Sequence, residues 1–254
     1  MDNYTEINAK AIDRWVEGGW EWGTPVSAEE CAKARRGEWN VLLTPTRFVP
    51  KDWFPPMSGL KLLGLASGGG QQMPLFSILG ADCTVMDLSD RQLESERIVS
   101  QREGYSINII KADMTKRFPF EDGSFDLIFH PVSNVYVEDV YHVWRECYRV
   151  LRPGGVLLSG LCNGINFLFD SWKRPLTVAN KLPFNPLKDP ALMKKLADED
   201  STVQFSHTFD EQIGGQLKAG FVITGAYEDY NNEPGCAIPE DGIPTYWATR
   251  AIKL

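Results

Sequence analysis

The amino-acid sequence predicts an α/β fold in which helices connect the strands of a mostly parallel β-sheet. Two observations support this fold class. Through the middle of the chain, short apolar segments typical of strands alternate with amphipathic segments typical of helices. The chain also has 254 residues, of which 43% are apolar, and this is enough for the core of one large domain with additions.

The first strand and its turn are expected at residues 60–70. Residues 60–65 form an apolar run, Ala66 and Ser67 follow, and three consecutive glycines precede a helical pattern over residues 71–79. Such a turn points backbone N–H groups and a helix N-terminus toward a polar or anionic ligand. Glycines let that ligand approach the backbone closely. We therefore expect a small-molecule site here.

The remaining elements follow in chain order. Ser89 and Gln92 form a capping-box pattern that predicts a helix toward Gly104, and Thr208 with Glu211 predicts another that ends near Gly220. Apolar residues at helical spacing predict an amphipathic helix over 140–151, which Arg152-Pro153-Gly154-Gly155 ends. The later strands are expected at residues 83–87, 107–111, 125–129, 156–158, 221–227 and 246–252.

Two regions lie outside this alternation. Residues 1–58 hold five of the eight tryptophans and a short helix that Ser27 and Glu30 would cap. Residues 162–206 are rich in Phe, Pro, Lys and Asn. We expect an N-terminal cap over 1–58 and a main domain over 59–254 with an insertion at about 162–206. Both additions would cover the mouth of the sheet, where ligands of open α/β folds bind.

Composition disfavours several classes of function. The 34 acidic and 26 basic residues give a net charge of −8, which disfavours nucleic acid and anionic membranes as partners. No segment reaches the roughly 18 apolar residues of a membrane helix, and the N-terminus lacks a signal-peptide pattern. Five scattered cysteines and three histidines predict reduced thiols in a cytoplasmic protein and imply no metal.

Three chemical features are expected at the carboxyl ends of successive strands, namely the turn 66–70, Asp87 and Asp113. Asp87 ends the second strand, 17 residues past the last glycine. An acid in that position can accept hydrogen bonds from ribose hydroxyls. The combination predicts a nucleoside-containing ligand more strongly than the glycine turn does alone.

With Phe-Asp-Leu-Ile at 125–128 and Arg-Val-Leu-Arg-Pro-Gly-Gly at 149–155, the chain resembles the class I S-adenosylmethionine-dependent methyltransferases, in particular the methyltransferase type 11 group. The resemblance covers about residues 58–160. It implies a Rossmann-like, seven-stranded, mostly parallel sheet with a reversed last strand and helices on both faces. It also implies S-adenosyl-L-methionine as cofactor, S-adenosyl-L-homocysteine as product, and a methyl acceptor.

The resemblance also implies roles for individual residues. Asp87 would bind the ribose hydroxyls, Leu88 would pack on the adenine, and Asp113 would meet the adenine amino group with Met114 beside it. Gly64 stands where the family usually has an acid that helps hold the cofactor's amino group, so that contact would come from elsewhere, such as the N-terminal region. The residues beside the methionine part of the cofactor would be Ala66 (a glycine in most of the family), Ser67, Gly68, Gly69, Gly70 and Gln72.

The acceptor side of the site is expected near His130, directly after the fourth strand. This histidine could act as a general base, or it could hydrogen-bond the cofactor or the backbone. Trp15 or Trp39 could line the methyl-transfer cavity, where the ring face would attract a sulfonium or ammonium group. Most of the tryptophans should instead anchor the N-terminal segment to the core. The other candidates for the acceptor pocket, which share the loop after His130, are Ser133, Asn134 and Tyr136.

These features predict a methyltransferase that acts on a small-molecule acceptor, because covered mouths suit small substrates. The loop at residues 130–133 also lacks the Asn/Asp-Pro-Pro-Tyr/Phe pattern of enzymes that methylate amino groups of bases. One alternative is a non-catalytic protein that binds S-adenosylmethionine or S-adenosylhomocysteine, which Gly64 keeps open. Another is an NAD-dependent Rossmann oxidoreductase, although Met73 stands where its G-x-G-x-x-G fingerprint requires a third glycine. The acceptor and the oligomeric state are left open.

Overall fold

The computed structural model describes residues 3–254 and contains one seven-stranded sheet. Its order is β3-β2-β1-β4-β5-β7-β6, and β7 runs antiparallel to both β5 and β6 while the other pairs are parallel. The predicted seven-stranded sheet with a reversed last strand is therefore confirmed. The strands are β1 Lys61–Leu65, β2 Asp82–Asp87, β3 Asn108–Lys111, β4 Phe125–His130, β5 Leu151–Cys162, β6 Phe221–Asp229 and β7 Tyr246–Lys253.

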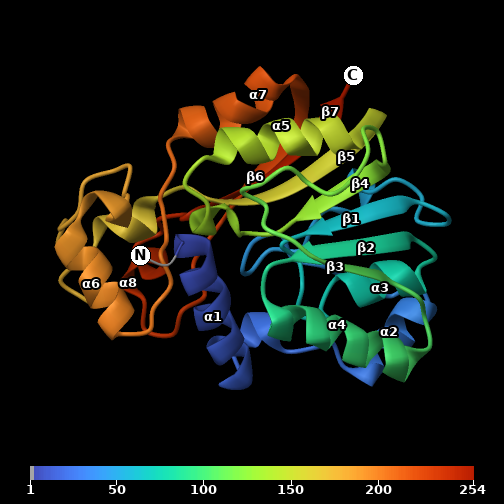
Figure 1. Cartoon of the computed structure of the whole chain (residues 1–254), viewed down its shortest axis with the longest axis horizontal. Coiled ribbons are helices and arrows are strands. Elements are labelled where there is room, and N and C mark those ends of the chain that lie inside the picture. The colour runs from blue at the N-terminus through green and yellow to red at the C-terminus, as the bar shows by residue number, and fades with distance from the viewer. Residues whose placement is uncertain (1–2) are drawn as a thin grey trace.

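Helices cover both faces of this sheet (Figure 1). Helices α5 and α7 lie on one face, and α2, α3 and α4 lie on the other, while α1, α6 and α8 gather at one end. The α-helices are α1 Tyr4–Glu17, α2 Ala28–Arg35, α3 Met73–Ile78, α4 Asp90–Glu103, α5 Val140–Val150, α6 Pro190–Asp198, α7 Gly215–Ala219 and α8 Ala237–Glu240. The short helical turns are η1 Glu21–Gly23, η2 Lys51–Trp53, η3 Asn134–Tyr136, η4 Ile165–Leu168, η5 Pro186–Lys188 and the π-type η6 Asp210–Gly214.

The strand sequences divide the core between the two faces. Successive side chains of a strand point to opposite faces, so Leu62 joins one apolar cluster with Phe76 of α3, and Leu63 joins the other with Trp144 of α5. All four side chains are buried. This double burial explains why β1 reads as a continuous apolar run.

Two of the three predicted capping boxes form completely, and the third forms in part. Ser27 and Glu30 make a complete capping box at α2, and Thr208 and Glu211 bond reciprocally before η6. Ser89 accepts a hydrogen bond from the Gln92 backbone N–H at 3.1 Å, but the Gln92 side chain donates to the Trp22 carbonyl instead of closing the box. The α4 cap is therefore half of the predicted motif, because the N-terminal segment competes for the amide.

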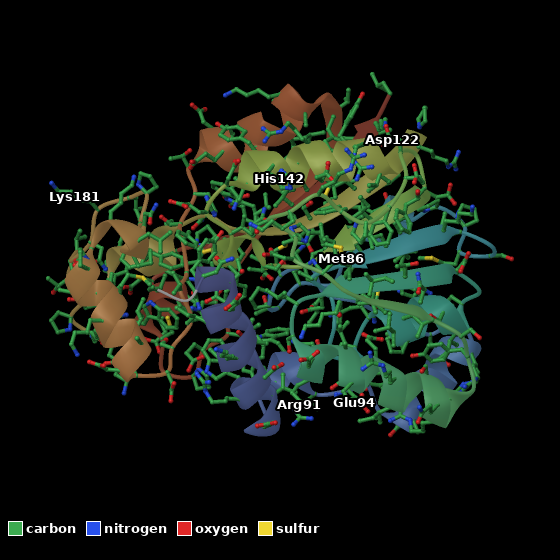
Figure 2. All side chains as sticks on the ribbon, viewed as in Figure 1. Met86, Arg91, Glu94, Asp122, His142 and Lys181 are labelled. Atoms are coloured by element: carbon green, nitrogen blue, oxygen red, sulfur yellow. The ribbon has the colours of Figure 1, made fainter. Side chains whose placement is uncertain are left out.

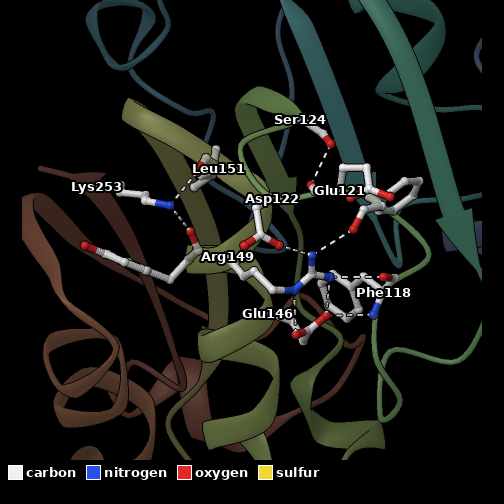
Figure 3. A network of polar contacts seen from close by, with 10 residues as sticks. Phe118, Glu121, Asp122, Ser124, Glu146, Arg149, Leu151 and Lys253 are labelled. Atoms are coloured by element: carbon white, nitrogen blue, oxygen red, sulfur yellow. Dashed lines mark hydrogen bonds and ion pairs between the residues drawn. The ribbon is translucent and has the colours of Figure 1, made fainter.

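The Arg-Val-Leu-Arg-Pro-Gly-Gly motif joins α5 to β5 and carries a polar network (Figure 3). The Arg149 guanidinium donates to Glu146 at 2.7 Å, to Asp122 at 2.8 Å and to the Phe118 carbonyl at 3.0 Å. It thereby fixes the loop before β4 against α5. Contrary to the expected strand start at residue 156, β5 begins at Leu151, and the four residues Arg152-Pro153-Gly154-Gly155 bulge out of its pairing with β4.

The N-terminal segment belongs partly to the core and partly to the cover of the sheet. Val41, Leu43 and Trp53 are buried in the same cluster as the strands. Helix α1 instead lies across the mouth, where Asp13 accepts from the Ser89 hydroxyl at 2.6 Å. Within residues 3–254, no helix is both long and apolar enough to cross a membrane.

Candidate active site

A cavity of about 460 Å³ lies at the carboxyl ends of β1, β2 and β4. The rest of its wall comes from α1, η1, residues 42–45, Gln92 of α4, the loop after β4, the segment after β5 and the connection between β6 and β7. A smaller hollow of about 60 Å³ adjoins it, and both are lined by Ile12, Ala66, Asp87 and Tyr136. The volume of the larger cavity is in the range of small-ligand sites.

The glycine turn between β1 and α3 presents only part of its length to the cavity. Ala66, Ser67 and Gly68 line it, whereas a side chain at Gly69 would meet Gln92, and one at Gly70 would meet the Ser95 carbonyl at 2.9 Å. These two glycines are therefore needed for close packing on α4. Gly69 and Gly70 were predicted to lie beside the ligand, but they face α4 and do not line the cavity.

The backbone N–H groups of the three glycines are also used inside the protein. Gly68 donates to Asp87 at 3.1 Å, Gly69 to the Gln92 carbonyl at 2.9 Å and Gly70 to Glu96 at 2.8 Å. The expectation that these amides face a ligand is therefore wrong. They tie the turn to β2 and α4, so that the surface of the turn is held in place.

Asp87 stands where the two cavities meet. Its carboxylate accepts from the Gly68 and Ser89 N–H groups at 3.1 and 3.0 Å, and it still lines both cavities. Desolvation raises the pKa of this carboxyl, and the backbone donors oppose that rise. The predicted adenine-side residues Leu88, Asp113 and Met114 line the smaller hollow.

At Gly64, where the family usually carries an acid, the Met73 side chain takes up the space beside the backbone. A Cβ built on Gly64 would lie 2.4 Å from the Met73 sulfur. The thioether thus fills the position, and Met73 is fully buried. Among the charged residues that line the cavity, Glu21 of η1 comes from the N-terminal region, which is where a replacement for the missing carboxylate was expected.

His130 does not reach the cavity, and the prediction of a general base there is corrected. The ring is fully buried, its Nδ1 lies 3.0 Å from the Leu65 carbonyl oxygen, and its Nε2 lies 2.9 Å from the Asn134 side-chain amide. Burial lowers the pKa of the imidazole, and the hydrogen bonds to Leu65 and Asn134 oppose that shift. The alternative expectation, a histidine that hydrogen-bonds the backbone, matches this geometry.

The other acceptor-side candidates divide in the same way. Ser133, Tyr136 and Trp15 line the cavity. Asn134 does not line it, since its amide is buried between His130 and Gln212. Trp39 is likewise a correction, because its ring packs against Phe54 and Phe76 in the core, at centroid distances of 5.2 and 6.1 Å, and not against the cavity.

Several residues that line the cavity were not predicted from the sequence. Trp20, Trp22 and Gln71 extend the wall beside the glycine turn, and the Gln71 amide donates to the Glu21 carbonyl at 2.7 Å. The far end of the cavity is lined by Asn166, Phe167, Trp172, Asn231, Glu233 and Tyr246. The insertion at 162–206 was expected to cover the mouth, but nothing local marked the connection between β6 and β7 as part of a site.

The comparisons with known proteins agree with this geometry. The family described as "Methyltransferase domain" matches residues 63–159. Over the full length of both chains, the sequence is 44% identical to the "Uncharacterized methyltransferase YbaJ" of Bacillus subtilis strain 168. The chain belongs to the class I S-adenosylmethionine-dependent methyltransferases.

Solved structures share this methyltransferase fold. An S-adenosylmethionine-dependent methyltransferase from Mesorhizobium loti is 22% identical with a TM-score of 0.62, over 80% of this chain and 95% of that one. A geranyl diphosphate methyltransferase in complex with S-adenosylmethionine is 19% identical with a TM-score of 0.56, over 89% of this chain and 86% of that one. S-adenosylmethionine is the cofactor of this family and of this chain.

The residues present fit that cofactor. The Ser67 hydroxyl and the Gln92 side-chain oxygen are buried without a hydrogen-bond partner, and both residues line the cavity next to Asp87. Buried polar atoms are rarely left unpaired in a native protein unless water or a ligand completes them. A polar ligand against the glycine turn would do so.

Proposed function

We propose that this methyltransferase transfers the methyl group of S-adenosylmethionine to a small-molecule acceptor. The observation that carries the proposal is the continuity of the site. The cavity runs from Asp87 and Ala66, at the ends of β2 and β1, to an aromatic and amide-lined end built by the later segments. One ligand can therefore lie at the strand ends while a second meets it inside the same enclosure.

The cofactor would lie across the ends of β1, β2 and β3. Asp87 would accept the ribose hydroxyls, and the smaller hollow with Leu88, Asp113 and Met114 would take the adenine. The methionine part would follow the turn past Ser67, Gly68 and Gln72 in the larger cavity. Its ammonium group would face Glu21, because Met73 occupies the space of the usual acid beside Gly64.

The reaction then depends on position and on exclusion of water. Bound S-adenosylmethionine supplies an activated methyl group on a sulfonium centre. Trp15 and Tyr136 line the region beside the glycine turn, where their rings shield the reactants and offer aromatic faces to positive charge. Holding the acceptor in line with the methyl group accounts for most of the rate increase that such a site can give.

The mouth of the cavity is covered in a way that favours small acceptors. The Asn8 amide of α1 donates to the Val203 carbonyl at 3.0 Å, and Arg14 donates to the Asp200 carbonyl at 3.0 Å. These contacts link α1 to the end of the 162–206 segment across the site. The structural relative that acts on geranyl diphosphate is also an enzyme with a small-molecule substrate, to judge from its name.

We also infer a cytoplasmic location, which the five cysteines support. All five are free and buried, so none serves a disulfide bond. Fractionation of cells that express a tagged chain tests this inference, and recovery from an extracellular fraction would contradict it.

Calorimetry and a labelled methyl donor test the proposed function. S-adenosylhomocysteine should bind with an affinity that falls in the Asp87→Ala variant, and NAD should not bind. Binding of NAD alone would favour an oxidoreductase. Radiolabelled methyl transfer to any small molecule of a cell extract distinguishes an enzyme from a non-catalytic protein that only holds the cofactor.

A further inference from the structure

The charge of the cavity restricts the acceptor that it can hold. Its charged lining residues are Glu21, Asp87 and Glu233, and no lysine, arginine or histidine of residues 3–254 lines it. A phosphate or carboxylate group of the acceptor would lose water there and gain no cationic side chain of the wall in return. The surrounding chain, with its net charge of −8, repels anions further.

The far end of the cavity combines aromatic faces with a carboxylate. Phe167 follows β5 on η4, Trp172 lies in the next loop, and Tyr246 begins β7. Glu233 lines the same end from the connection between β6 and β7 as an exposed side chain at its rim, and none of the ion pairs found among residues 3–254 involves it. Ring faces and a free carboxylate together attract a cation.

Two amides of this end, those of Asn166 and Asn231, are paired with the wall. Asn166 donates to the Tyr246 hydroxyl oxygen at 3.2 Å and receives a hydrogen bond from Asn231 at 3.4 Å. The Trp172 ring nitrogen donates to the Asn166 carbonyl at 3.0 Å, and the Glu233 backbone N–H donates to Asn231 at 2.8 Å. With these two amides engaged, the Glu233 carboxylate and the ring faces are the groups of this end that suit a cation.

No imidazole stands ready to remove a proton from the acceptor. His130 is paired on both nitrogens behind the wall, and the His207 ring lies 3.0 Å from the Asn134 carbonyl. His142 lies on α5, over the sheet face away from α4, where its ring contacts the Lys116 carbonyl at 2.8 Å (Figure 2). A hydroxyl acceptor would have to lose its proton in the cavity, whereas an amine attacks through a lone pair once it is the free base.

We propose that the methyl acceptor is an amine carried on a small apolar skeleton, with Glu233 and the rings of Trp172 and Tyr246 as its binding groups. This rests on the proposed function. The ammonium form binds and loses a proton to water at the open rim. The nitrogen lone pair then forms the N–CH3 bond, the C–S bond breaks with its electrons staying on sulfur, and the methylated ammonium later releases its extra proton to water.

Three probes with one skeleton test the acceptor class, namely phenethylamine, 2-phenylethanol and phenylacetate. Each is titrated by calorimetry into the full-length protein saturated with S-adenosylhomocysteine. We expect phenethylamine to bind at least about tenfold more tightly than phenylacetate. Glu233→Gln should weaken phenethylamine about threefold or more and change 2-phenylethanol by less than about twofold. Glu228→Gln, an exposed carboxylate of β6 outside the cavity, is the matched control and should change neither.

The inference is overturned if phenylacetate binds as tightly as phenethylamine, if none of the probes binds, or if Glu233→Gln affects amine and alcohol alike. Saturation with S-adenosylhomocysteine is measured first in the same cell. Failure of that step contradicts the proposed function, while success there followed by failure of the probes contradicts only the choice of an amine.

Discussion

Glu96 offers a quantitative test of how the glycine turn is held. This glutamate of α4 is fully buried beneath the turn, where one carboxyl oxygen accepts the Gly70 N–H at 2.8 Å and the other has no partner. Desolvation raises the pKa of Glu96 to about 8, the Gly70 N–H opposes the rise, and the negative charge of Asp87 adds to it. We predict that Glu96→Gln removes a loss of stability that the wild type shows as pH rises toward about 8.

The magnitude follows from the two pKa values. The unfolded glutamate has a pKa of 4.5, so between that pH and about 8 the folded state keeps a proton that the unfolded state has lost. The folded state binds more protons there, and the free energy of unfolding falls as pH rises through this window. At about 1.4 kcal/mol per pKa unit, the wild type loses about 2–3 kcal/mol from this group between about pH 6 and pH 9.

Urea denaturation at these two pH values measures the effect. Glutamine keeps a carbonyl oxygen for the Gly70 N–H but has no charge, so the variant should gain about 2–3 kcal/mol on the wild type between pH 6 and pH 9. Glu94→Gln is the control, because Glu94 lies on the exposed surface of the same helix and pairs with Arg97 at 3.1 Å (Figure 2). Equal pH dependence in wild type and Glu96→Gln would refute the reasoning.

Three other substitutions test the site. Asp87→Ala should weaken S-adenosylhomocysteine binding by about 1–3 kcal/mol in calorimetry, because the ribose acceptors are lost, and unchanged affinity would remove Asp87 from the site. Ala66 has a left-handed φ of 46°, so Ala66→Gly should raise the free energy of unfolding, measured in urea, by about 1 kcal/mol. A decrease would show that this backbone conformation does not destabilise the protein. His130→Leu should lower stability by about 1–3 kcal/mol, because the Leu65 carbonyl and Asn134 amide lose their partner. The affinity of His130→Leu for S-adenosylhomocysteine should stay within about twofold of the wild type. A larger fall would show that the His130 ring contributes to cofactor binding.

The sequence by itself determined the strands, the helices that connect them and their order. Strand runs, caps such as Ser27 with Glu30, and the amphipathic pattern of α5 depend on residues a few positions apart, so each can be recognised locally. The placement of Asp87 at the end of β2 follows from the same local signals, because parallel strands bring their carboxyl ends to one edge. These features produce the predicted seven-stranded sheet.

The tertiary structure alone decided which side chains face the cavity. His130 and Ser133 are three residues apart, yet one is paired behind the wall and the other lines the cavity. Trp15 and Trp39 likewise separate into wall and core. Glu233 lies far along the chain from the glycine turn and reaches the site through the folding of β6 and β7. Whether a side chain faces the cavity or the core depends on how distant segments pack, and local periodicity cannot predict that packing.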